Sequence, residues 1–149
     1  MRTWFITSTT YGTWLPGDKR GFVSNTPDED GDWGRHNLPE TPYDANVPHQ
    51  AELANSILKC PPIYLFTAQA DAILAQFQET CLHRGWKLHI SAVMANHFHA
   101  VLSVNDAVES DDILRDLKSY ASRRLNKSWH RPASDAWWTK SGSRRPVHD

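Results

Sequence analysis

The fold of this chain is decided by the stretch from Trp86 to Val104, which reads WKLHISAVMANHFHAVLSV. Apolar and polar residues alternate on both sides of Ala95-Asn96, and such alternation is typical of strands with one buried face. Two strands joined by a two-residue connection predict a β-hairpin. We expect one face of the first strand to carry Trp86, Leu88, Ile90, Ala92 and Met94.

A helical pattern flanks the predicted hairpin on each side. Before it, Thr67 can cap a helix that ends at Gly85, where a left-handed C-cap is easily formed. The apolar positions of this helix recur at three-and-four spacing and are Ala70, Ile73, Leu74, Phe77 and Cys81. After the hairpin, a helix from about Ser110 to Lys127 carries the apolar stripe Ile113, Leu114, Leu117, Ala121 and Leu125.

Two outer segments complete the order of elements. Thr3 to Thr10 is rich in aromatic and β-branched residues and predicts a first strand. Trp137-Trp138-Thr139 leads into a Gly/Ser/Arg stretch that indicates a last strand. The order strand, helix, strand, strand, helix, strand predicts an α+β, ferredoxin-like split βαβ sandwich, with helices on one face of an antiparallel sheet. The other face would be open to a ligand.

Length and composition favour one domain over residues 1–149. Residues from about 11 to 62 hold most of the Gly and Pro and predict an irregular insertion, with at most a short helix over Gln50 to Leu58. The two cysteines do not form a metal-type pair, so a disulfide framework is not expected. Neither a signal region nor a membrane-length apolar run is visible, and we expect a cytoplasmic protein.

The charge is unevenly distributed, although the formal net charge is −1. Residues 1–60 hold eight acids and five bases, whereas residues 113–149 hold nine bases and three acids. A basic segment fits phosphate binding and a solvated helix face equally well, and its DNA-binding candidates are Lys118, Arg123 and Arg124. Trp14 and Trp33 in the loop are better placed than Trp137-Trp138 to stack on unpaired bases, although packing is the commoner role of a tryptophan.

His97 and His99 are the candidate metal ligands. Residues two apart on a strand point to the same face, so the two imidazoles project together while Phe98 points toward the helices. Neutral imidazoles suit divalent metals. Two histidines at this spacing are nevertheless an ordinary coincidence on a strand, and the spacing alone favours one residue that faces solvent and one that packs at a sheet edge. If Ala95-Asn96 is a two-residue turn, His89 lies opposite Leu102 on the Phe98 face and is not a third ligand.

The residues around the histidines resemble a known family. Val93–Leu102 is similar to the V-M-P-N-H-x-H-hydrophobic core of the IS200/IS605-like transposases and their REP-associated relatives in the HUH superfamily, with alanine where proline is common. Gly85-Trp86 and Leu117–Arg123 resemble the G-W and L-K-S-x-x-S-R patterns of the same family. Trp4–Thr7 and Thr10–Gly17 resemble the N-terminus of one subgroup, so the likeness spans nearly the whole chain.

The resemblance implies an enzyme that binds single-stranded or hairpin DNA and cuts it by tyrosine transesterification. It implies Mg²⁺ or Mn²⁺ held by His97 and His99, and DNA contacts that include Trp14. Family members occur as dimers and as monomers, so a homodimer is one expectation, and no membrane partner is expected. The metal would polarise the phosphodiester, because a tyrosine oxygen is otherwise a poor nucleophile at neutral pH.

This sequence departs from the family at its C-terminus. The family nucleophile lies on a helix after the last strand in a Y-x-x-x-Q arrangement, but no tyrosine follows Tyr120 and no glutamine follows Gln78. We therefore expect an incomplete C-terminus, with the family nucleophile beyond Asp149. Tyr120 is the candidate nucleophile left, although its place at the edge of an apolar helix stripe favours a structural role. The alternatives are a hairpin-binding module or inactive remnant, and a phosphoesterase that would need histidine at Val101.

Overall fold

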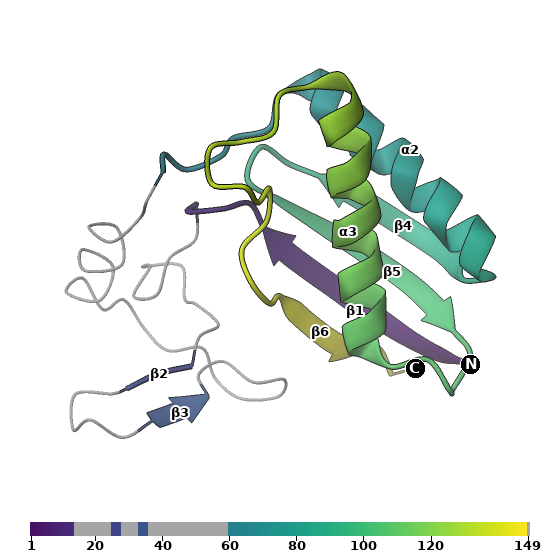
Figure 1. Cartoon of the computed structure of the whole chain (residues 1–149). Helices are drawn as coiled ribbons and strands as arrows, with labels where there is room; N and C mark the ends of the chain where they lie inside the picture. The colour runs from purple at the N-terminus through teal and green to yellow at the C-terminus, as the bar shows by residue number, and fades with distance from the viewer. Residues whose placement is uncertain (14–24, 28–32, 36–59, 149) are drawn as a thin grey trace.

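The computed structural model describes residues 1–13, 25–27, 33–35 and 60–148 (Figure 1). Four strands form one antiparallel sheet in the order β4-β5-β1-β6. Their bounds are β1 (Arg2–Thr9), β4 (Lys87–Val93), β5 (His97–Val104) and β6 (Ser143–Pro146). A separate two-stranded sheet is formed by the antiparallel pair β2 (Asn25–Pro27) and β3 (Trp33–Arg35). The segment Gln50 to Leu58, where we expected at most a short helix, lies outside the described residues.

The two helices, α2 (Thr67–Arg84) and α3 (Ser110–Ser128), cover the same face of the four-stranded sheet (Figure 1). Each connects strands that are not neighbours in the sheet, and this topology is the split βαβ arrangement. The predicted α+β, ferredoxin-like fold is therefore confirmed. Among the described residues, neither helix has the length and apolar character needed to cross a membrane.

The predicted helices agree with the observed ones except at one cap. The N-cap of α2 is Phe66 rather than Thr67, and the backbone N–H of Phe66 donates to Oε1 of Gln69 at 3.1 Å. A Gln side chain three residues into a helix can satisfy this N–H, so the threonine hydroxyl is not needed there. The helix ends as predicted, because Gly85 adopts a left-handed conformation with φ of 69°.

The core lies between the helices and the sheet. The buried side of α2 is formed by Ile73, Phe77 and Cys81, while all five residues of the predicted α3 stripe are buried. Phe98 of β5 is fully buried and meets Phe77 edge-on, with ring centroids 4.8 Å apart. Burial also raises the pKa of the Cys81 thiol to about 11, which keeps this cysteine protonated and unreactive.

The C-terminal tryptophan pair also belongs to the core. Trp137 and Trp138 are buried, and Trp138 packs edge-on against Phe98 with centroids 5.2 Å apart. The indole N–H of Trp137 donates to Oδ1 of Asn126 at 2.8 Å. The last strand begins after this pair, where a Cβ on Gly142 would lie 2.7 Å from the carbonyl oxygen of Thr7. The missing side chain therefore allows the chain to approach β1 closely.

A β-bulge at His89 overturns part of the predicted hairpin register. The two-residue turn holds from Val93 opposite Phe98 to Ile90 opposite Val101, but Leu88 pairs with Leu102. His89 is the extra residue, and an extra residue shifts the alternation of the strand by one. Before the bulge, Trp86 and Leu88 pack against the core, whereas Ile90 and Met94 after it are exposed. The five residues predicted to share a face therefore divide between both faces.

Candidate metal centre

His97 and His99 project from the face of the sheet that the helices leave uncovered. Phe98, between them, packs against α2, and neighbouring residues of a strand point to opposite faces. The two imidazole centroids are 4.8 Å apart, with their planes at 70°. Both side chains are half-buried. The fold thus brings the two predicted ligands together on one rigid strand.

Each imidazole is oriented by a hydrogen bond at Nδ1. Nδ1 of His97 lies 2.7 Å from Oδ1 of Asn96, and Nδ1 of His99 lies 2.8 Å from Oγ1 of Thr7. A carboxamide oxygen only accepts, so His97 donates from Nδ1 and the neutral ring carries its lone pair on Nε2. The Thr7 hydroxyl can accept from His99 in the same way. A bond of this kind sets the tautomer and ring orientation that metal-binding histidines require.

The surroundings of His99 favour its neutral form. Phe5 of β1 stacks on the imidazole, with centroids 5.3 Å apart and planes at 25°. Partial burial lowers the pKa of His99 below its ordinary value, because the charged ring loses hydration. Only the neutral ring has a lone pair for a metal, so packing and protonation state both suit coordination.

Two nitrogens are what the described chain offers at this site. Within residues 1–13, 25–27, 33–35 and 60–148, no group of three or more His, Cys, Asp or Glu side chains could hold a metal ion.

The family follows from a comparison of the sequence with known families. The family described as "Transposase IS200 like" matches residues 64–142, which is more than half of the chain. The chain belongs to this family. A crystal structure of a "putative transposase" from Deinococcus radiodurans R1 is similar to this IS200-like transposase in fold, with a TM-score of 0.56 and 12% identity. That similarity covers 100% of this chain and 82% of the other. No protein with a curated description matches the sequence.

Tyr120 of this transposase lies in the helix layer, on the other side of the sheet from the histidines. It is half-buried on α3, with the guanidinium carbons of Arg123 and Arg84 at 5.0 and 6.0 Å from its ring centroid. The structure therefore does not bring Tyr120 to His97 and His99. Its contacts tie α3 to α2, since Arg84 belongs to the latter helix.

The expected position of the family nucleophile is not tested by the structure. We expected this residue beyond Asp149, on a helix that follows the last strand. The described residues end at His148, after β6, and Asp149 itself lies outside them. The incomplete C-terminus therefore stays a prediction.

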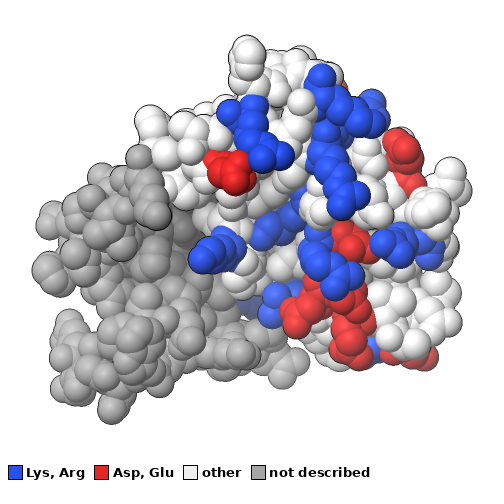
Figure 2. Space-filling view, in the orientation of Figure 1, with Lys and Arg blue, Asp and Glu red and all other residues white. Residues whose placement is uncertain are grey.

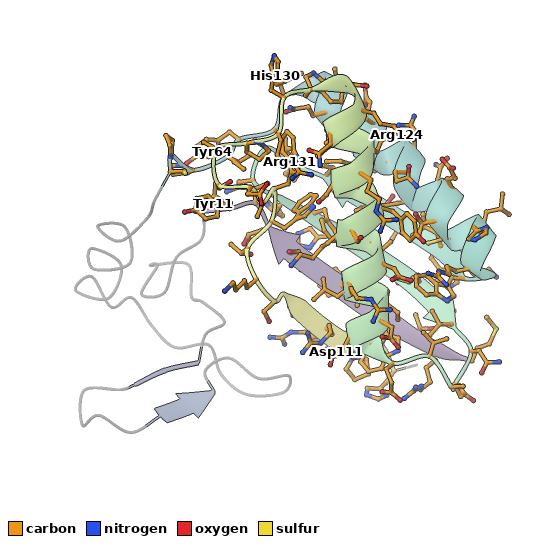
Figure 3. The ribbon with its side chains drawn as sticks, in the orientation of Figure 1. Tyr11, Tyr64, Asp111, Arg124, His130 and Arg131 are labelled. Atoms are coloured by element: carbon orange, nitrogen blue, oxygen red, sulfur yellow. The ribbon has the colours of Figure 1, made fainter. Side chains whose placement is uncertain are left out.

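The three cations predicted to contact DNA also lie in the helix layer of the transposase, and each has an intramolecular partner. Figure 2 shows Lys and Arg side chains along this face, mixed with acidic side chains. Arg124 projects toward α2 (Figure 3), where it meets Glu79 at 3.5 Å, and Arg123 lies over Tyr120. Nζ of Lys118 donates to the carbonyl oxygens of Thr139 and Ser141.

The side chain of Lys118 is partly buried. Burial and the charge of Arg144 lower the pKa of its ammonium to about 8. Its two carbonyl contacts anchor residues 139–141 on α3 just before β6. Trp14, the fourth predicted DNA contact, lies outside the described residues, as does the side chain of Trp33.

Sequence reasoning missed several residues at the histidine end of the sheet. Thr7 carries no local signal, because its partner His99 is 92 residues away. Tyr11 and Tyr64 lie together at the end of β1 (Figure 3). The backbone N–H of Leu65, next to Tyr64, donates to the carbonyl oxygen of Ala95 at the hairpin tip at 2.6 Å. The backbone N–H of Ile63 donates to the carbonyl oxygen of Tyr11 at 2.9 Å. These two tyrosines are therefore at the same end of the sheet as His97.

Proposed function

We propose that this transposase binds single-stranded or hairpin DNA on the open face of its sheet. His97 and His99 hold Mg²⁺ or Mn²⁺ there for cleavage by tyrosine transesterification. The observation that carries the proposal is the shared face of the two imidazoles, each oriented through Nδ1 by Asn96 or Thr7. A bound metal would polarise the phosphodiester and stabilise the charge that develops on its oxygens.

The charge of the sheet supports a polyanionic partner. The strands β1, β4, β5 and β6 contain no Asp or Glu. They carry four cations and three histidines. Lys87 and Arg145 lie on the open face, where they pair with Ser103 and Phe5. Arg2 and Arg144 are on the helix side, where Arg144 meets Asp111 of α3 at 2.9 Å. The acids of the two helices lie in the layer that covers the opposite face, in α2 and α3. A DNA strand on the open face therefore meets no carboxylate from these strands.

The residues around the two histidines position the reacting phosphate rather than attack it. Thr7 and Asn96 hold the two rings, and Phe5 shields one side of His99 from water. Tyr120 is on the other layer, and we therefore propose that the attacking tyrosine is a different residue. Binding to a DNA hairpin without cleavage is the alternative function, and it needs the same open face but no nucleophile.

Two measurements test the proposal. Calorimetry with Mn²⁺ should give a binding signal that disappears in His97→Ala and in His99→Ala, with His83→Ala on α2 as the matched control. Persistence of the signal in either ligand variant would show that the metal site is wrong. Affinity for single-stranded DNA should fall as salt rises, by about 0.7 in logarithmic slope for each phosphate neutralised. Equal affinity for blunt duplex DNA would contradict the proposed substrate.

A further inference from the structure

We infer that His89 of β4 is a second contact for the DNA strand on the open face, separate from the proposed metal ligands His97 and His99. This inference rests on the proposed function and adds a positioning residue to it. His89 is exposed, and its Nε2 lies 2.7 Å from Oγ of Ser103. Ser103 shares its face with His99 because the two are four residues apart on one strand.

The β-bulge is what turns His89 toward that face. In a regular hairpin, His89 would point into the core opposite Leu102, but here Leu88 takes that partner. A bulge costs one interruption of the ladder and commonly redirects a side chain near a functional site. The interruption is confined to His89, because β4 is regularly paired with β5 from Ile90 to Val93.

A chain of hydroxyl groups holds the ring of His89 in place. Ser103 Oγ lies 2.7 Å from Oγ1 of Thr3 on β1 as well as from His89, and Ser103 is only 7% exposed. The imidazole is therefore anchored across three strands while its outer edge reaches solvent. Among the described residues, none forms a hydrogen bond with Nδ1 of His89, which remains available to a phosphate oxygen.

The position of His89 suits an extended single strand. Ser103 is about 13 Å from His99 at the usual rise of a strand, so a short run of nucleotides can span the two sites. Lys87 is exposed and pairs with Ser103, which adds a cation beside His89. Between the sites lie Val101 and Phe5, which are paired and half-buried on the same face. An apolar strip with a cationic end fits bases and phosphates, respectively.

The test compares the unmodified chain with His89→Gln on labelled oligothymidines of increasing length, in the presence of Mn²⁺. Glutamine keeps a polar group that can bond to Ser103 but loses the imidazole. His83→Gln is the matched control, because it makes the same change at an exposed histidine of α2. Affinity of His89→Gln should fall by about tenfold for oligomers long enough to span both sites. Affinity for the shortest oligomers should be unchanged, and so should Mn²⁺ binding.

A second variant separates positioning from folding. Ser103→Ala removes the anchor but keeps His89, and it should reproduce the loss for long oligomers while its thermal unfolding shows an intact domain. If His89→Gln binds oligomers of every length as tightly as His83→Gln does, the inference is wrong and the proposed function stands. If the unmodified chain binds no single-stranded DNA at all, the proposed function itself fails.

Discussion

Oγ1 of Thr7 lies 2.8 Å from Nδ1 of His99, so a hydroxyl on β1 orients an imidazole on β5. Thr7→Val should lower the affinity for Mn²⁺ by about ten- to a hundredfold, since the ring loses its outer-shell partner but keeps its own nitrogen ligand. Calorimetry would measure the change. Thr7→Ser retains the hydroxyl and should bind like the unmodified chain. Equal affinities for the Val and Ser variants would show that this hydrogen bond does not support the site.

The lowered pKa of His99 predicts how stability depends on pH. Its pKa in the folded protein lies below the ordinary value of 6.5, so the unfolded chain binds the proton more readily. The contribution of His99 to stability is therefore fully present above pH 6.5 and is lost as the pH falls through the folded pKa. Urea unfolding of the metal-free protein at a series of pH values should show this decline. In His99→Gln, the free energy of unfolding should depend less steeply on pH. An unchanged pH dependence would contradict the prediction.

Asp116 joins the two helices through a nearly buried carboxylate. It meets Arg84 of α2 at 3.0 Å and Arg115 at 3.3 Å, and its side chain is 9% exposed. Asp116→Asn should destabilise the protein by about 1–2 kcal/mol, because charge-assisted hydrogen bonds are lost while both arginines can turn toward water. Asp112→Asn is the control, since its pair with Arg115 is exposed and should change stability by less than about 0.5 kcal/mol. Denaturant unfolding measures the loss of stability in each variant. Equal losses in Asp116→Asn and Asp112→Asn would show that Asp116 does not stabilise the contact between the helices.

Tyr120 should not be the nucleophile, because it lies in the helix layer against Arg123 and Arg84. Tyr120→Phe keeps the ring and should change neither DNA binding nor stability by more than about 0.5 kcal/mol. With suicide substrates and Mn²⁺, any covalent adduct should persist in this variant. Peptide mapping would then show whether the phosphate is on Tyr11 or Tyr64 instead. An adduct that disappears only in Tyr120→Phe would overturn the placement of the reaction on the open face.

Local spacing was sufficient to predict the helices, the hairpin and the shared face of His97 and His99. These features depend on residues close together in the chain, where the periods of a helix and a strand dictate which side chains align. The apolar stripe of α3 and the end of α2 at Gly85 followed for the same reason. The amino-acid sequence by itself therefore determined the order of the four sheet strands and two helices and the pair of imidazoles, but not the short strands β2 and β3.

Tertiary structure decided what surrounds that pair. The bulge at His89 appears only when β4 is laid against β5, because an interrupted register leaves no mark on a pattern that alternates in sequence. Thr7 is 92 residues from His99, and no local spacing relates them. Lys118, Arg123 and Arg124 form part of a basic segment in the sequence, but packing places them on the helix layer with partners of their own. Such relationships arise from long-range strand pairing and burial. Only the assembled sheet and its helices determine which face is covered and which is left open by the helices.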